Sequence, residues 1–398
     1  MDSTRPAVRE RIAVAATFSA HAVVAGTVGP WIPSLKARSG LDAGALGLAL
    51  GAYAGGLVAG TRLAGPVVRR TGRGAVRTGI PLLAAALALL PLAGRLAWLA
   101  GIFALLGLVS GLLDVAMNLE AAAVEARARR RVMSGMHGAW SASMLVGAAI
   151  ASAGVAARVP IEVHLAVVAI LLAAGSWPLL RWLPPAGNEH PGRRPAADRG
   201  PPSPATSSVR SSPRSTGTVV LLCLIPFAAF LTEGVAAEWS AVYLRSSAGT
   251  TPGVAGVGIV AFSAGMAASR FPGDRLAARI EPSTVVGTGT AVAAAALGTA
   301  LIAGGAAAAL TAFTLVGLGV GPAVPLAFSE AARMRRPRSG SVLGLAVTAG
   351  YLGSIAGPMA VGFTADRFGL RTALVIPVAM CLAAALGAGA IRPRPAAR

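Results

Sequence analysis

Residues 108–140 read LVSGLLDVAMNLEAAAVEARARRRVMSGMHGAW, and this stretch decides the fold. An apolar segment carries Asp114 and Asn118 four residues apart, followed by Glu120 and by four arginines between positions 127 and 131. A new apolar segment starts directly after them. An aspartate at the centre of a membrane helix costs about 2.5–3.5 kcal/mol on insertion scales, so Asp114 needs a compensating role. The stretch predicts one membrane helix, a basic loop and the beginning of a second helix.

The composition extends this prediction to the whole chain. Of the 398 residues, 55% are apolar and only 13% are charged, whereas soluble domains carry about 25% charged residues. The mean hydropathy is +0.69, which indicates a protein that crosses a membrane many times. The net charge of +20 does not indicate nucleic-acid binding, because the arginines form short clusters between apolar spans. Among the 35 basic residues the single lysine is Lys36, and this bias, with abundant Ala and Gly, is typical of a GC-rich bacterial coding sequence.

Apolar spans of about 20 residues, the length that crosses a bilayer, occur twelve times. They cover residues 12–33, 44–66, 78–95, 97–122, 133–157, 162–183, 218–244, 253–277, 283–304, 306–331, 340–364 and 370–391. With this count, 28 of the 35 basic residues fall on the side of the N-terminus. The positive-inside rule then places both termini in the cytoplasm of a bacterial inner membrane.

Residues 184–217 are rich in Pro, Ser and Arg and lack an apolar period, which predicts a flexible cytoplasmic linker. The linker separates six spans in residues 1–183 from six in residues 218–398. Two segments that follow the second and eighth spans match, namely RLAG at 62–65 and RFPG at 270–273. We therefore expect an all-α membrane protein whose twelve transmembrane helices form two pseudo-symmetric six-helix bundles.

Five segments carry a resemblance to a known family. They are WIPSLK at 31–36, GLLDVAMN at 111–118, MSGMH at 133–137, EGVAAEWSAVYL at 233–244 and RFPGDR at 270–275. With these, the chain resembles the major facilitator superfamily, and within it the bacterial fucose-permease-like and uncharacterised inner-membrane transporters. The resemblance implies secondary active transport by alternating access, often coupled to protons, and places the first, fourth, seventh and tenth spans around a central cavity.

The chain departs from that family in its loop after the second span. Residues 60–77 hold five arginines and no acid, and Pro66 stands where the second half has Asp274. The candidate gating residues are therefore Arg62 in the first half and Arg270, Asp274 and Arg275 in the second. The segment GFTADRFG at 362–369 matches the loop motif, but the span count places it on the opposite side, between the last two spans.

Asp114 and Asn118 share one face of the fourth span with Ser110. Asp114 either titrates a proton or binds substrate beside the Asn118 amide, or it pairs with an arginine or caps a neighbouring helix to hold the bundle. Glu120 lies off that face and nearer the arginines, which favours a structural ion pair.

The first and seventh spans hold further candidates. Glu233 and Glu238 lie five residues apart, so they cannot face one cavity equally; each is a coupling or substrate residue, or a structural one. Trp239 offers a surface for stacking a sugar ring, or it belongs to an interfacial aromatic belt. His21 relays protons or forms a neutral hydrogen bond. In the tenth span, Pro322 and Pro325 predict a gating hinge or a static kink.

The leading hypothesis is a proton-coupled transporter of a small polar, sugar-like solute. The alternative is an exporter of an amphipathic drug or natural product by proton antiport, which the nearly wholly apolar tenth span suits. A membrane enzyme or sensor is a third class, but the sequence has no nucleophile–base pair, metal cluster or phosphate loop. We expect no enzyme activity, no metal and no cofactor, and as partners a small solute, protons and the lipid bilayer around a monomer.

Overall fold

The computed structural model describes residues 4–72, 74–128, 132–182, 216–270, 280–333 and 342–392, and all regular elements in them are helices. A first group of helices consists of α1 (Thr4–Arg38), α2 (Ala43–Thr71), α3 (Gly74–Leu89) with the short η1 (Leu90–Leu92), α4 (Leu96–Ala128), α5 (Met133–Ala156) and α6 (Ile161–Leu180). A second group consists of α7 (Thr216–Ser246), α8 (Pro252–Arg270), α10 (Pro282–Ala303), α11 (Ala306–Val320), α12 (Ala323–Arg333), α13 (Val342–Phe368), α14 (Leu370–Ala373), α15 (Val375–Gly387) and η3 (Ala388–Ile391).

These helices confirm the all-α membrane fold. Within the described residues, 11 helical segments are long and apolar enough to cross a membrane, and α6 lies where the sixth span was predicted. The helices extend past several predicted spans. For example, α1 begins at Thr4, before the predicted span that starts at residue 12. Its first turns carry arginines, so the apolar run used to predict the span does not include them. The predicted linker lies almost entirely outside the described residues.

The tenth span is broken in the middle. Helix α11 ends at Val320 and α12 begins at Ala323, with Gly321 and Pro322 between them. Proline lacks the amide that would continue the hydrogen-bond ladder, and the next helix starts with the Leu326 amide bonding the Pro322 carbonyl at 3.2 Å. The break thus lies at Pro322, whereas Pro325 is an exposed residue of the first turn of α12.

The same helix pairings recur in the two groups. In the first group α1 packs on α5, α2 on α4 and α3 on α6; in the second, α7 packs on α13, α8 on α11 and α10 on α15. By order of spans these are the same pairs. Glycines bring the second and fourth spans into backbone contact in both groups, since a Cβ at Gly107 would overlap the Tyr53 carbonyl and one at Gly317 would overlap that of Phe262. This recurrence gives a physical basis for the predicted pseudo-symmetry.

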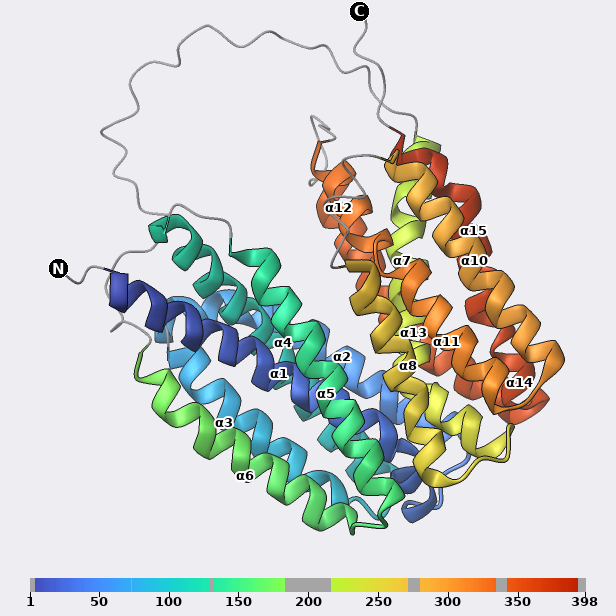
Figure 1. Cartoon of the computed structure of the whole chain (residues 1–398), viewed down its shortest axis with the longest axis horizontal. Helices are drawn as coiled ribbons and strands as arrows, with labels where there is room; N and C mark the ends of the chain where they lie inside the picture. The colour runs from blue at the N-terminus through green and yellow to red at the C-terminus, as the bar shows by residue number, and fades with distance from the viewer. Residues whose placement is uncertain are drawn as a thin grey trace, which may run out of the picture.

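The two groups lie side by side and contact one another mainly through α2 with α13 and α5 with α8. We call the end where α1 begins the near end and the opposite end, where α2 begins and α13 ends, the far end. In Figure 1 the ribbons of the two groups converge at the far end and diverge toward the near end. A Cβ at Gly47 would lie 2.9 Å from the Pro358 carbonyl oxygen, and one at Gly253 would lie 2.5 Å from the Ala156 Cβ. The tightest contacts between the groups therefore lie toward the far end.

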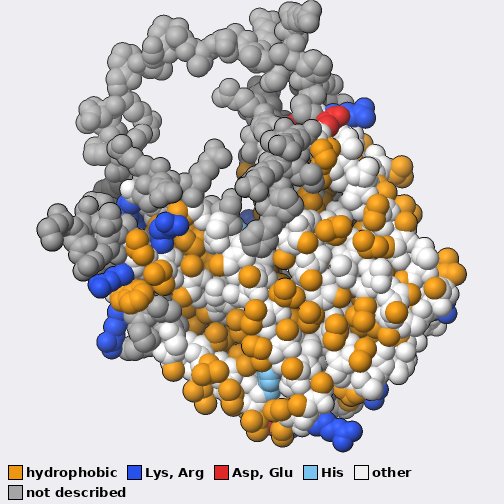
Figure 2. All heavy atoms as spheres, viewed as in Figure 1, with side chains coloured by type: hydrophobic (Ala, Val, Ile, Leu, Met, Phe, Trp, Pro, Cys, Tyr) orange, Lys and Arg blue, Asp and Glu red, His pale blue; other side chains and the backbone are white. Residues whose placement is uncertain are grey.

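The outer surface is suited to lipid. Figure 2 shows apolar side chains spread over the middle of the visible face, with Lys and Arg side chains at its margins. Large apolar residues such as Leu386 and Ile302 are 88% and 82% exposed. In water such a surface would be costly, whereas a bilayer covers it without penalty.

Candidate functional site

Asp114 and Asn118 lie on one face of α4, as the sequence predicts. The Asn118 Nδ2 donates to the Asp114 carbonyl oxygen at 2.8 Å and approaches Asp114 Oδ1 at 3.3 Å. Both residues are half-buried, while Ser110, one turn earlier, is buried. Among the described residues, no basic side chain forms an ion pair with the Asp114 carboxylate. Asp114 is thus a carboxylate inside the helix bundle whose hydrogen bond comes from its own helix.

His21 on α1 is held beside α4 by a tryptophan of α5. The Trp140 Nε1 donates to His21 Nδ1 at 3.0 Å. Because an indole N–H can only donate, Nδ1 is the acceptor and the proton of the neutral ring is on Nε2. That Nε2 is buried without a hydrogen bond among the described residues, and the ring lies against the backbone of Ser110. The structure therefore sets one neutral tautomer, with its N–H beside the face that carries Asp114.

Two tyrosines that the sequence analysis missed lie next to this face. Tyr53 of α2 is beside the Ser110 hydroxyl and within electrostatic range of both Asp114 and Glu238. Tyr351 of α13 is beside the Thr61 hydroxyl and within electrostatic range of Asp114. The chain has only three tyrosines. Their rarity in an Ala- and Gly-rich membrane protein was the feature of the sequence that could have marked them as candidate site residues.

Tyr351 belongs to an aromatic cluster of the second group, which we define as Phe230, Phe328 and Tyr351. Phe230 stacks on Tyr351 with ring centroids 6.3 Å apart and planes at 18°, and its centroid lies 6.4 Å from that of Phe328. All three rings are half-buried. Since Tyr351 is within electrostatic range of Asp114, the cluster brings aromatic rings of the second group near the candidate site.

The two glutamates of α7 differ in their surroundings. Glu233 Oε2 lies 3.8 Å from an Arg270 guanidinium nitrogen, and the side chains are 20% and 31% exposed. The Arg270 Nε also points toward the Gly321 carbonyl at 3.5 Å, at the break of the tenth span. Glu238 has an oxygen, Oε2, that is buried with no hydrogen bond among the described residues. Glu233 is therefore paired within the second group, and Glu238 lies within electrostatic range of Tyr53 of the first.

Trp239 does not offer the stacking surface that the sequence suggested. Its side chain is 0% exposed, and its Nε1 is buried without a hydrogen bond among the described residues. In this conformation the ring is covered by protein, so neither an open stacking face nor an interfacial belt position applies. The half-buried rings of the aromatic cluster are available instead.

The remaining candidates lie around this centre or outside it. Arg62 is exposed and within electrostatic range of Tyr351. Glu120 is half-buried, two turns toward the near end from Asp114, and it has an interaction partner. Asp274 and Arg275 lie outside the described residues. The structure thus brings Asp114, Asn118 and His21 together, relates Glu238 to them through Tyr53, and leaves Glu233 with Arg270.

Comparison with known proteins gives consistent results. The model of the Major Facilitator Superfamily matches residues 14–247 and 222–398. An uncharacterised MFS-type transporter of Yersinia pestis is 29% identical over 394 residues, which cover 98% of this chain and 97% of that protein. The membrane protein MosC of Rhizobium meliloti is 30% identical over 273 residues, which cover 67% of this chain and 61% of that protein.

Two solved structures share the fold. A D-xylose-proton symporter superposes with a TM-score of 0.67 at 15% identity, covering 97% of both chains. A bacterial homologue of the human lysosomal transporter Spinster, in an inward-facing and occupied conformation, superposes with a TM-score of 0.69 at 15% identity, covering 99% of both chains. At this identity the likeness shows the fold alone.

Proposed function

Because the chain belongs to the major facilitator superfamily, and is thus a multi-pass membrane transporter and not an enzyme, we propose that it couples proton movement to the transport of a small polar organic solute. The observation that carries the proposal is Asp114, a carboxylate inside the bundle without an ion-pair partner among the described residues. A charge in such a place is costly, so it is neutralised by a proton or by a bound solute.

Exchange between these two states couples the flows. With solute bound, hydrogen bonds or a positive group of the solute compensate the Asp114 charge, and the proton leaves. With the site empty, a proton binds and lets the empty protein change conformation. Neighbouring polar groups from both groups of helices, among them Tyr53 and His21 of the first and Tyr351 of the second, assist in orienting the solute. A ligand shifts the conformational equilibrium by its differential affinity for the two states.

The moving bodies in this proposal are residues 1–183 and 218–398, joined by the linker at 184–217. The near end faces the cytoplasm of a bacterial inner membrane, because most basic residues lie there. The contacts concentrated toward the far end then correspond to a conformation that is closed to the outside. A single chain holds a complete site, so a monomer suffices.

A second candidate function is the export of an amphipathic compound by proton antiport. The aromatic cluster favours it, since Phe230, Phe328 and Tyr351 present half-buried rings and Tyr351 is within electrostatic range of Asp114. Aromatic faces bind planar and cationic molecules. A solute with an apolar ring and a cationic group matches both sides of the site, while a sugar uses the polar side more.

Proteoliposomes that enclose a pH-sensitive dye test the proposal. D-xylose serves as the polar probe and ethidium as the amphipathic cation. We expect one of them to cause a proton flow coupled to its own movement, and Asp114→Asn to abolish that proton flow. Glu281→Gln, which alters a half-exposed carboxylate at the start of α10, away from the site, is the control that leaves transport unchanged. If Asp114→Asn accumulates solute against a gradient at the rate of the unaltered protein, Asp114 does not couple.

A further inference from the structure

A carboxylate of the second group caps a helix of the first group at the far end. Asp366, in the last turn of α13, accepts hydrogen bonds from the backbone amides of Ala43 and Gly44. The distances are 2.8 Å to Oδ1 and 2.7 Å to Oδ2, and the partners are 323 and 322 residues apart in sequence. Ala43 and Gly44 are the first two residues of α2. Each oxygen of one carboxylate thus bonds one free amide of a helix N-terminus, where negative charge is favourable.

The N-terminus of α2 has a cap of its own that leaves these two amides open. Asp42 Oδ1 accepts from the Ala45 amide at 2.7 Å, and the Asp42 carbonyl accepts from the Leu46 amide at 3.2 Å. The first four amides of a helix have no partner within it. The bond from Leu46 is the first regular bond of the helix, so the Asp42 side chain provides for one open amide, that of Ala45, from the same group. Asp366 provides for the amides of Ala43 and Gly44 from the opposite group.

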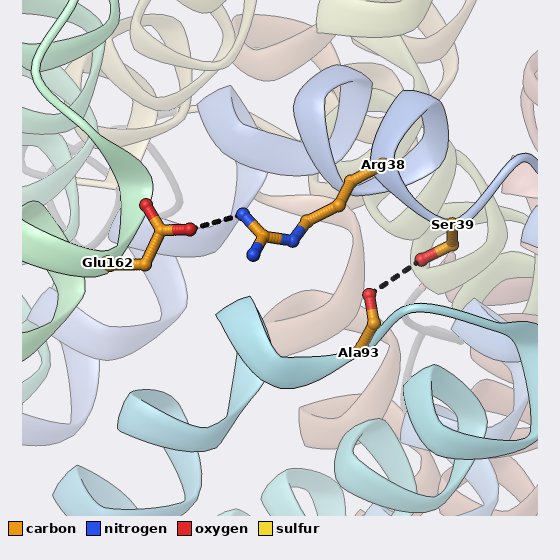
Figure 3. Close-up of polar contacts among 4 residues, drawn as sticks. All are labelled: Arg38, Ser39, Ala93 and Glu162. Carbon is orange, nitrogen blue, oxygen red and sulfur yellow. Dashed lines mark hydrogen bonds and ion pairs between the residues drawn. The ribbon is translucent and has the colours of Figure 1, made fainter.

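The helix start that receives Asp366 is held firmly in the first group. Figure 3 shows Arg38, at the end of α1, in an ion pair with Glu162 of α6, and the Ser39 Oγ donating to the Ala93 carbonyl at 3.1 Å. These contacts tie the connection between α1 and α2 to two neighbouring elements. When the groups separate, α2 therefore moves with the first group and Asp366 with the second.

The helices also approach closely beside the carboxylate. A Cβ at Gly362 would lie 2.7 Å from the Ala43 carbonyl oxygen, and one at Gly44 would overlap Oδ2 of Asp366. The absence of a side chain at Gly44 is thus a steric condition for the cap. By contrast, a Cβ at Gly55 of the same helix would meet nothing within 4 Å.

We propose that Asp366 is a gating residue, which closes the transport path at the far end by capping α2 across the two groups. The cap exists only while the far end is closed, so it stabilises that conformation over one in which the far end is open. The loop that follows α2 at the near end carries arginines and no acid. Asp366, an acid that links the two groups, is instead found at the far end, in the segment GFTADRFG.

Distance measurements by pulsed electron paramagnetic resonance test this without any solute. Spin labels on cysteines placed at Arg95 and Ile302, exposed residues of the two groups at the far end, report its opening. The background carries Cys223→Ala and Cys381→Ala. We expect Asp366→Ala to raise the ratio of open to closed molecules about tenfold, within the range of lost helix caps and dipole contacts. Gly44→Ala, which keeps the carboxylate but displaces it, should raise the ratio in the same direction.

Two matched controls identify the cause. Asp42→Ala removes the cap that belongs to the same group, and Gly55→Ala adds a methyl group to α2 away from the contact; neither should change the distances. Unchanged distances in both Asp366→Ala and Gly44→Ala overturn the proposal. A shift in Asp42→Ala as large as in Asp366→Ala also overturns it, because the effect would then come from α2 stability. If Asp366→Ala does not fold, Gly44→Ala and Asp366→Asn decide the matter in the same assay. The readout needs no proton coupling, so it stands apart from the test of Asp114.

Discussion

Asp114 on α4 and Glu233 on α7 are both carboxylates inside the bundle, but within the described parts of the chain only Glu233 has a cation beside it. Glu233 lies 3.8 Å from Arg270, whereas Asp114 is hydrogen-bonded to Asn118 of its own helix. A paired carboxylate keeps its charge in every conformation that preserves the pair. An unpaired one must exchange its charge for a proton or a ligand. The position of an acid in a membrane helix therefore says less about its role than the presence of a partner from another helix.

Replacing each carboxylate by its amide gives the largest expected difference. We expect Asp114→Asn to lower pH-driven accumulation about 100-fold, the range of lost proton-transfer groups. Glu233→Gln should lower it by a factor of about five or less, since a partly exposed pair contributes about 0–1 kcal/mol. Initial uptake rates in proteoliposomes at equal protein content measure both. Equal losses in the two variants would remove the distinction between a paired and an unpaired acid.

The stability of the Glu233–Arg270 pair gives the second test. Arg270→Gln leaves Glu233 without its cation and should lower the melting temperature in detergent by about 2–4 °C, which corresponds to about 1 kcal/mol. Glu233→Gln combined with Arg270→Gln should recover most of this loss, because no uncompensated charge remains. A double variant whose loss equals the sum of the two single losses would show that the residues are not coupled.

The sequence was sufficient for the parts of the structure that depend on local properties. The length of the apolar runs located the spans, and the period of the α-helix placed Asp114 and Asn118 on one face. Pro322 and Pro325 indicated an irregularity in the tenth span, where the structure has a break at Pro322. These features need only neighbouring residues. The span count also placed the segment around Asp366 between the last two spans, although its sequence resembles the motif of the loop after the second span. The structure confirms this place, because α13 ends at Phe368.

Contacts between distant helices were beyond the sequence. Arg270 as the partner of Glu233 and Asp366 as the cap of α2 depend on how helices rotate and pack. The same holds for Trp239, whose burial follows from the face that α7 turns toward the core. In membranes the packing of small residues sets these rotations, and a single sequence shows many glycines without showing which of them meet.

Tyr351 tests whether the aromatic cluster contributes to the unpaired site. If the cluster binds an apolar ring of the solute, Tyr351→Ala should weaken ethidium binding about tenfold, while Tyr351→Phe should keep most of the affinity, as the ring contributes more than the hydroxyl. D-xylose transport should change less in both. Leu352→Ala is the control, since Leu352 is the next residue on α13 and is 55% exposed. Fluorescence titration in detergent measures the ethidium affinity, and equal losses in Tyr351→Ala and Leu352→Ala would exclude the cluster from the site.

The smallest expected effect concerns the histidine that lies beside the unpaired acid. Trp140→Phe removes the donor to His21 Nδ1, so the neutral ring should populate both tautomers, while transport falls by a factor of about five or less, the worth of one neutral hydrogen bond. Nitrogen-15 spectra of histidine-labelled protein distinguish the tautomers, and His21→Gln assigns the signal among the four histidines. Trp31→Phe, beside His164 at a ring distance of 5.4 Å, is the control that leaves the His21 signal unchanged. A single Nε2-protonated form that persists in Trp140→Phe would mean that the backbone of Ser110 alone sets the tautomer. The His21 ring beside Asp114 would then be oriented by α4 alone, without Trp140 of α5. The surroundings that distinguish the unpaired Asp114 from the paired Glu233 would in that case come from α4.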